Sequence, residues 1–503
     1  MKQYNYCANK IIKLDTMSSF SVDKMPKELK RAYKRSLTLT LALAVFFAIT
    51  FLYLWNASVL LRFGIAILVL AVSGHMIART NGLQDAYGAY LLGGKHGIKF
   101  VSFLSKKSPK LWIAFADWGL VFSFGILSYF MFRKYVSKRM VLFGVITILA
   151  MLLFVYPYLP IVFDFINIPQ ITSRISTAPA SQGVSILYYL IVAASLIGGF
   201  SALTIILILY SGGSILYTLL LFAFGLFSSK PNYAILNEQI PGVAPLIPGL
   251  TIPFFAGLIA LFILLVVHEF SHGVLAKIAR VRIKSIGVIL FGVIPMGAFV
   301  EPDEREVKKL KRSSQDRISI AGVSANMLTS ILFFILTFAL LTYILPNMST
   351  GGVLVTQLIK NYSAYGVIAP NSTITGWDNV TIRNSFDLSK AEAAYVPGSV
   401  VRITTNTGSY SLIPDASGRI GIIGAPAQLT PDYQSSEFLF AVAALSFGLN
   451  FFVAIFNLLP IPAFDGWRIY QNQIKSKKLL NAIAAVLIIA ILLNVLPWFW
   501  TIS

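Results

Sequence analysis

The stretch "LLVVHEFSHGVLAK" (residues 264–277) places two histidines and a glutamate inside a run that otherwise has the composition of a membrane-spanning helix. A charged or titratable side chain near the bilayer centre costs about 2.5–3.5 kcal/mol on insertion scales. His268, Glu269 and His272 lie within five residues of one another, so we expect them to pair with, or bind, something. The stretch therefore predicts a membrane protein with a functional site inside one of its helices.

Composition supports this prediction over the whole chain. Of 503 residues, 56% are hydrophobic and only 12% are charged, whereas soluble domains carry about 25% charged residues. Repeated apolar runs predict a polytopic α-helical membrane protein with about 9–11 transmembrane helices. The net charge of +21 is typical of positive-inside loops next to a lipid bilayer and does not indicate nucleic-acid binding. The single cysteine, Cys7, excludes an internal disulfide and a cysteine-based metal cage.

Apolar segments long enough to span a membrane recur along the chain. The candidate spans are 36–56, 59–76, 112–132, 141–163, 184–206, 208–228, 250–274, 318–345, 437–459 and 479–500. The run "GVILFGVIPMGAFV" (287–300) is too short to span and is interrupted by glycine, which favours a re-entrant or interfacial segment.

A polar segment of different character separates two of these spans. Residues 350–432 are rich in Thr, Ser, Asn and Gly, and "SVVRITTNTGSYSLI" alternates in polarity around a turn at "NTG", which predicts a β-hairpin. "PNSTITGWDNVTI" adds further turn chemistry. The segment is predicted to form a small soluble domain between two membrane helices.

The distribution of basic residues predicts the orientation. Residues 276–317 hold ten Lys and Arg and residues 466–478 hold four, whereas the polar insert holds five across a longer stretch. Basic loops face the cytoplasm, so we expect the insert to face outward. Four N-x-[ST] sequons, at Asn347, Asn361, Asn371 and Asn379, support an external insert if the host glycosylates.

The sequence does not decide the orientation of the spans before residue 133. Two basic clusters, 1–35 and 133–139, both favour the cytoplasm, yet three candidate spans separate them. Either one candidate does not span, or a weaker fourth span lies within 84–104. The basic tail itself can set topology or bind anionic lipid.

"HEFSH" has the spacing H-E-x-x-H. Residues i and i+4 share one helix face, so both imidazoles can reach one metal ion. Zinc brings the pKa of its bound water close to neutral, and the intervening glutamate can act as general base. Zinc needs a third protein ligand, and "FNLLPIPAFDGWRIY" (456–470) offers Asp465 after a helix broken by prolines. The orientation places Asp465 on the same side as the histidines.

These residues together carry a family resemblance. "HEFSHG" in one membrane helix and "NLLPIPAFDG" in a later one resemble the two motifs of the site-2 protease family of intramembrane zinc metalloproteases. "FGVIPMGAFVEPDE" (291–304) is similar to the family's re-entrant β-loop, and "AGVSANM" (321–327) to its G-x-x-x-N element. The polar insert resembles a PDZ domain. The resemblance covers about residues 250–503 and leaves the first 245 residues unexplained.

The resemblance implies roles for individual residues. It implies His268, His272 and Asp465 as ligands of one zinc ion per chain and Glu269 as general base. It implies, less directly, substrate or transition-state support from Asn457, Pro460 and Gly466, although Asn457 can equally make an interhelical hydrogen bond. Gly322 and Asn326 are predicted to pack helices together.

The resemblance also implies a domain plan. The predicted parts are a basic cytoplasmic tail (1–35), an accessory multi-span region (36–245), the first half of a protease core (246–345), an extracytoplasmic PDZ-like α+β domain (346–434) and the second half of the core (435–503). The lone His75 and His96 are assigned no role in the site.

The implied function is zinc-dependent endopeptidase activity on transmembrane segments of single-span proteins, in a cell membrane, with the site toward the cytoplasm. The PDZ-like domain would bind a carboxyl terminus left by an earlier cut, or exclude uncut substrates by size. A membrane metal-ion transporter or receptor with a sensory outer domain is the alternative, because His and Asp within spans also mark ion pathways. A family member that has lost activity and serves as a scaffold is a second alternative.

Overall fold

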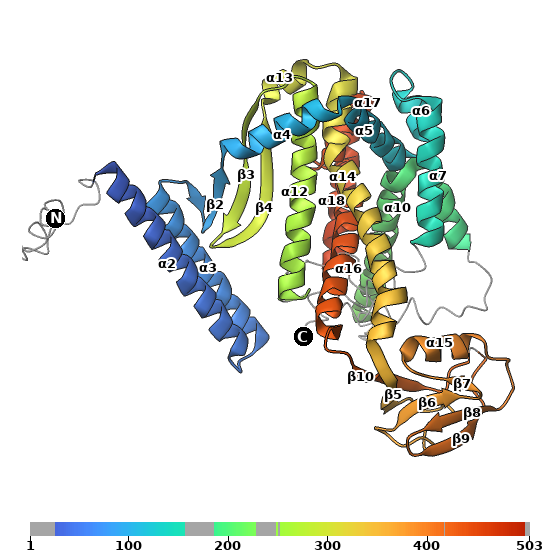
Figure 1. Cartoon of the computed structure of the whole chain (residues 1–503). Coiled ribbons are helices and arrows are strands. Elements are labelled where there is room, and N and C mark those ends of the chain that lie inside the picture. The colour runs from blue at the N-terminus through green and yellow to red at the C-terminus, as the bar shows by residue number, and fades with distance from the viewer. Residues whose placement is uncertain (1–25, 156–185, 228–247, 250–251, 417, 498–503) are drawn as a thin grey trace, which may run out of the picture. The chain divides into compact units, whose positions relative to one another are not determined.

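The computed structural model describes residues 26–155, 186–227, 248–249, 252–416 and 418–497 (Figure 1). Most of the basic tail, including Cys7, therefore lies outside the described residues, as do the ends of the predicted spans 141–163, 184–206, 208–228, 250–274 and 479–500. The chain divides into two compact units, which are described separately. One comprises Met1–Gly94 with Ile286–Phe299, and the other comprises Lys95–Ser285 with Val300–Ser503.

The first unit combines a helical pair with most of a small sheet. Helices α2 (Lys27–Leu54) and α3 (Val59–Asn81) pack together. The sheet has the order β1-β2-β3-β4, with β1 (Asp85–Ala86), β2 (Ala89–Gly93), β3 (Ile283–Phe291) and β4 (Ile294–Pro302). The run 287–300, predicted as a re-entrant or interfacial β-loop, thus forms most of a β-hairpin. Gly292 occupies its turn with a φ of +62°, a conformation that glycine adopts without strain.

The second unit is mainly helical. Its helices are α4 (Lys95–Lys107), α5 (Pro109–Phe124), α6 (Leu127–Phe132), α7 (Lys138–Phe154), α10 (Ile186–Phe227), α12 (Phe254–Ile278), α13 (Glu304–Lys309), α14 (Arg312–Ala339), α16 (Tyr433–Phe456), α17 (Asp465–Gln473) and α18 (Lys477–Val495). Helix α14 is central, because it packs against α5, α12, α16 and α17 (Figure 1). Its C-terminal end continues through a short π-helix (Leu340–Ile344) and a 3-10 turn (Leu345–Met348).

Seven helices in the described part of the chain are long and apolar enough to cross a membrane, which makes the chain a polytopic integral membrane protein. They are Arg31–Leu52, Leu61–Asn81, Ile191–Leu226, Phe254–Ile278, Arg312–Ile344, Tyr433–Phe456 and Lys477–Val495. The described residues leave out 156–185 and 228–247, so this number does not test the 9–11 spans predicted for the whole chain. Within the described residues, α5 and α7 have only 16 and 17 residues, and two predicted spans fall within α10.

Two predicted span boundaries are wrong, because two glycines break the helices elsewhere. The predicted span 112–132 is interrupted at Gly125, between α5 and α6, and the helical conformation of α10 is interrupted at Gly199 instead of near residue 207. The two breaks lie against each other, since a Cβ on Gly125 would approach the Gly199 nitrogen to 2.7 Å. Ile126 also donates its N–H to the carbonyl of Leu196 at 2.9 Å.

The polar insert forms a small α+β domain between α14 and α16 (Figure 1). Its elements are β5 (Ser349–Leu358), β6 (Thr373–Trp377), β7 (Val380–Thr381), α15 (Ser385–Ala393), β8 (Val401–Thr405), β9 (Gly408–Leu412) and β10 (Ile422–Leu429). The sheet has the order β10-β5-β6-β8-β9, with β7 beside β6. The hairpin predicted at "NTG" is confirmed as β8 and β9, which pair from Val401↔Leu412 to Thr405↔Gly408. The domain has its own hydrophobic core, which includes Val355, Ile374, Trp377 and Ile403.

Candidate metal centre

Helix α12 carries the two histidines one turn apart. Because its 25 residues are almost all apolar apart from the motif and Lys277, the helix buries easily among its neighbours α14 and α16. His268 is 8% exposed and His272 is partly buried. The i, i+4 spacing brings their rings to one face, with centroids 4.9 Å apart.

The loop after α16 places the carboxylate. Helix α16 ends at Phe456, and the prolines at 460 and 462 prevent its continuation. The chain then returns, because Gly466 donates its N–H to the carbonyl of Asn457 at 2.7 Å. A Cβ on Gly466 would lie 2.4 Å from the Leu458 oxygen, so only glycine permits this closure. The result is that Asp465 becomes the first residue of α17.

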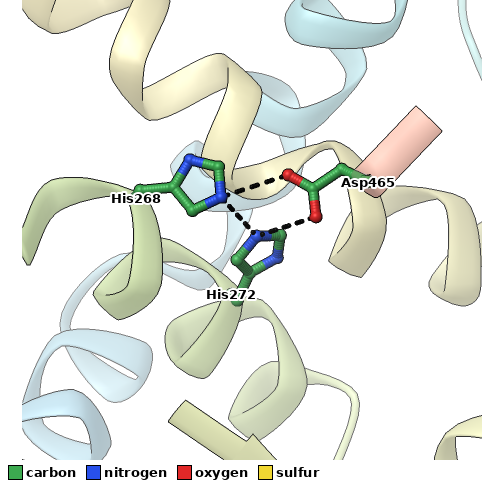
Figure 2. Close-up of side chains that lie close together, drawn as sticks. All are labelled: His268, His272 and Asp465. Atoms are coloured by element: carbon green, nitrogen blue, oxygen red, sulfur yellow. Dashed lines mark hydrogen bonds and ion pairs between the residues drawn. The ribbon is translucent and has the colours of Figure 1, made fainter. Parts of the chain in front are cut away.

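His268, His272 and Asp465 converge on one point (Figure 2). The Nε2 atom of His268 lies 3.2 Å from Oδ2 of Asp465, and the Nε2 atom of His272 lies 3.3 Å from Oδ1. The two Nε2 atoms are 3.3 Å apart. Four-coordinate zinc with ligand distances of about 2.0–2.2 Å separates its ligand atoms by about 3.4 Å. The spacing therefore suits a tetrahedral zinc ion.

The hydrogen bond on the far side of His272 fixes which nitrogen faces this point. Its Nδ1 atom lies 2.6 Å from the carbonyl oxygen of Ile318. A carbonyl only accepts, so Nδ1 carries the hydrogen and Nε2 of the neutral ring presents a lone pair. That lone pair faces a carboxylate and a second imidazole. Oδ2 of Asp465 has no hydrogen-bond partner among the described residues. A divalent cation is the group that such a cluster of acceptors accommodates.

Asn326 fixes the other histidine. The Nδ2 end of its side-chain amide lies 3.1 Å from Nδ1 of His268, Oδ1 has no hydrogen-bond partner among the described residues, and Asn326 is completely buried. The oxygen and nitrogen of an amide are interchangeable in shape, so hydrogen bonding decides between them. A histidine that binds a metal through Nε2 carries its hydrogen on Nδ1 and donates it to a neighbouring acceptor. The amide oxygen of Asn326 in that position meets this requirement.

Gly322 makes room for both rings. A Cβ at this position would lie 2.5 Å from Nε2 of His268 and 2.5 Å from Nε2 of His272. Ile318, Gly322 and Asn326 are spaced by four residues and form one face of α14. Gly322 and Asn326, predicted as helix-packing residues, thus lie directly against the histidines. Ile318 was missed because its contribution is a backbone carbonyl, and the repeat of four residues in "ISIAGVSAN" is the signal that points to it.

Glu269 is held separately from the three converging side chains. Its carboxylate accepts a hydrogen bond from the backbone N–H of Val300, near the end of β4, at 3.0 Å. The contact orients the carboxylate. The backbone N–H of Val300 has no sequence signature, so the motif alone does not predict this contact.

Asn457 and Pro460, also predicted for the site, lie in the loop between α16 and α17. Asn457 forms the C-cap of α16 and accepts from Gly466 through its backbone carbonyl. Pro460 is buried in the same turn. Ala463 adopts a φ of +81°, which is rare for a residue with a side chain. His75 lies in the first unit, where its Nδ1 atom is 3.1 Å from Asp85.

Comparison with known proteins covers the segment that carries these residues. Residues 256–496 match the profile of peptidase family M50. A 244-residue stretch is 28% identical to the uncharacterized protein MJ0971 of Methanocaldococcus jannaschii, and the alignment covers 46% of this chain and 61% of that protein. The family is one of membrane metalloproteases, and its members use zinc. Residues 256–496, which carry both motifs and all three converging side chains, are thus similar to peptidase family M50, the site-2 protease family.

Proposed function

We propose that this chain is a zinc-dependent intramembrane endopeptidase that hydrolyses peptide bonds within transmembrane segments of other membrane proteins. The observation that carries the proposal is the convergence of His268, His272 and Asp465 from α12 and α17, with both imidazoles oriented by α14. Similarity to family M50 supports protease chemistry. The apolar composition of α12 supports a substrate that is itself in the membrane.

The three converging side chains would hold the zinc ion, one per chain. When bound, zinc supplies Lewis acidity and brings the pKa of a water ligand close to neutral. The protein's own contribution is the orientation of the ligands. Ile318 and Asn326 fix the two rings through Nδ1, and the Gly466–Asn457 hydrogen bond fixes the loop that carries Asp465.

Glu269 is assigned the role of general base. A general base must be aimed at the proton that it accepts, and the hydrogen bond from the Val300 N–H holds the Glu269 carboxylate in place. Glu269 would take a proton from the attacking water and deliver it to the leaving amine. Asn457, Pro460 and Gly466 would support the site indirectly, by closing the loop that presents Asp465.

Strand β4 offers a docking edge for an extended substrate. Strand β4 ends the sheet order β1-β2-β3-β4, and an edge strand can pair with an unwound peptide through backbone hydrogen bonds. This supports the family-like role of the 287–300 hairpin as a re-entrant β-loop. The substrate class proposed is a single-span membrane protein.

We also propose that the metal centre faces the cytoplasm and the insert faces outward. The two basic loops lie together in the second unit, because Arg468 of α17 donates to Glu304 of α13 at 2.9 Å. The α+β domain begins at the opposite, C-terminal end of α14. Its six strands and single helix suit the PDZ-like role predicted above, either capture of a carboxyl terminus or exclusion of uncut substrates by size.

The deciding experiment changes Glu269. We expect the Glu269→Gln variant of the full-length protein to retain zinc, because Glu269 is not one of the converging ligands, and to lose cleavage of a single-span substrate by at least about 100-fold, the usual size of a general-base contribution. The matched control is Glu301→Gln, which removes an exposed carboxylate one residue after Val300.

A metal-ion transporter or receptor does not need a glutamate at this position. Wild-type protein that binds zinc and moves it across a vesicle membrane without cleaving any membrane protein would favour that alternative. Retained cleavage in Glu269→Gln would exclude Glu269 as the base. The family match does not favour either non-enzymatic reading.

A further inference from the structure

A buried polar network connects α17, the helix that begins at Asp465, with the accessory region before residue 256. Asn472 of α17 donates from its amide to Oδ1 of Asp316 at 2.6 Å, and the hydroxyl of Tyr135 donates to Oδ2 at 2.5 Å. Asp316 is completely buried. Tyr135 lies between α6 and α7. One carboxylate of α14 thus joins an accessory tyrosine to the ligand-bearing helix.

The tyrosine is itself held in place. Arg317, the next residue of α14, makes a two-pronged ion pair with Asp117 of α5, at 2.7 and 2.9 Å. The guanidinium of Arg317 lies 5.2 Å from the centre of the Tyr135 ring, which is within the range of a cation–π contact. Tyr135 is therefore fixed both through its ring and through its hydroxyl.

A second contact fixes α17 from another accessory helix. The hydroxyl of Tyr470 lies 2.6 Å from Oγ of Ser201 in α10, and Ser201 is buried. Phe124 of α5 packs edge-on against the Tyr470 ring at 5.6 Å. Since α17 has only nine residues, hydrogen bonds at Tyr470 and Asn472 constrain the helix that presents Asp465.

The same short stretch of α14 reaches the histidines. Asp316 binds α17 through its side chain, and Ile318, two residues later, accepts the Nδ1 hydrogen of His272 through its carbonyl. Residues 316–318 therefore contact both the helix that begins at Asp465 and the ring of His272. A displacement of α17 relative to this stretch changes the distance from Asp465 to the imidazoles.

We propose that Tyr135 and Ser201 are positioning residues that, together with Asp316, set the place of Asp465 relative to His268 and His272. The proposal rests on the proposed function, because it assumes that these three side chains hold a metal. Sites of this kind need their ligands within about 0.5 Å of the productive geometry. Loss of a supporting hydrogen bond around a metal site reduces metal affinity or activity by about 10–100-fold.

The test removes one hydroxyl. In full-length protein loaded with cobalt(II), which takes zinc sites and reports their geometry by visible absorption, Tyr135→Phe should weaken cobalt affinity by at least about tenfold and alter the absorption spectrum. It should also lower kcat more than it changes KM. The matched control is Tyr129→Phe, on α6, whose hydroxyl makes no hydrogen bond within the described part of the chain. The control should match the wild type.

A double-variant cycle tests whether the effect passes through Asp316. Tyr135→Phe and Asn472→Ala act on the same carboxylate, so their effects on cobalt affinity should be non-additive. Ser201→Ala acts through Tyr470 and provides an independent variant, with the same expected loss of affinity, should Tyr135→Phe fail to fold.

The outcomes separate the two proposals. Wild-type protein without a stoichiometric cobalt site overturns the proposed function, and the positioning role with it. Wild-type protein with such a site, together with unchanged affinity and spectrum in Tyr135→Phe and Ser201→Ala, overturns the positioning role alone. Strictly additive effects of Tyr135→Phe and Asn472→Ala also count against it, because they mean that Asp316 does not couple the two residues.

Discussion

At the scale of single residues, the most sensitive position is one without a side chain. Gly322→Ala would place a methyl group 2.5 Å from Nε2 of both His268 and His272, closer than real Cβ contacts occur. One ring must move, so we expect zinc affinity to fall by at least about tenfold while the helices persist. Zinc titration of the purified variant measures this. Gly64→Ala, in open space on helix α3, is the control and should bind zinc as the wild type does.

Residues with distinctive chemistry were predictable from the sequence, and backbone contributions were not. The spacing of His268 and His272 and the carboxylate of Asp465 indicate a candidate metal site, because few side chains bind zinc. The carbonyl of Ile318 and the N–H of Val300 are common to almost every residue, so only the fold reveals their partners. Gly322 and Asn326 were recognised, but their contacts with the imidazoles required the packing of α14 on α12.

At the scale of elements, the crossing of α5 and α10 depends on two glycines. Gly199 has a φ of +66°. A Cβ added to Gly199 would lie 2.3 Å from the backbone of Ser123. The ψ of −168° at Gly199 places the residue in a backbone region that essentially only glycine adopts, so Gly199→Ala should destabilise the protein by at least about 1–3 kcal/mol, the cost of that backbone conformation alone. Thermal unfolding in detergent measures the change. Gly213→Ala, in open space on the same helix, should leave the melting temperature near that of the wild type or raise it, and a comparable loss in both variants would refute the crossing argument.

Helix positions in the family segment and in the first two predicted spans, 36–56 and 59–76, were predicted closely, whereas the helix breaks at Gly125 and Gly199 were not. The predicted spans 318–345 and 437–459 correspond to α14 with its continuation and to α16. Hydropathy identifies such helices because each is apolar along its length. The breaks at Gly125 and Gly199 depend on a partner helix that comes close to the backbone, and hydropathy carries no information about that partner.

At the scale of the whole molecule, two helices of the second unit determine how the basic loops relate to the polar insert. Helices α14 and α16 are both long and apolar enough to cross a membrane, and the insert lies between them in the chain. A chain that crosses at α14 and again at α16 has the basic residues 276–317 and 466–478 on one side and the insert on the other.

This arrangement makes a prediction about sidedness that thiol labelling can test. The chain has a single cysteine, Cys7, so Cys7→Ser provides a background without thiols. Asn379→Cys in the insert and Lys475→Cys in the last basic loop both lie at exposed positions. Because α14 has 28 residues and rises about 42 Å at 1.5 Å per residue, more than the roughly 30 Å of a hydrocarbon core, its two ends should lie on opposite sides of the membrane.

A membrane-impermeant maleimide applied to intact cells should label position 379 and leave position 475 unlabelled, and permeabilised cells should label both. The physical reason is the charge difference, since residues 276–317 carry ten Lys and Arg and the insert carries five over a longer stretch. Labelling of 475 but not 379 would reverse the orientation and place the metal centre outside. Labelling of both in intact cells would mean that α16 does not cross. Only the expected pattern is compatible with the proposal that His268, His272 and Asp465 lie toward the cytoplasm and the insert faces outward.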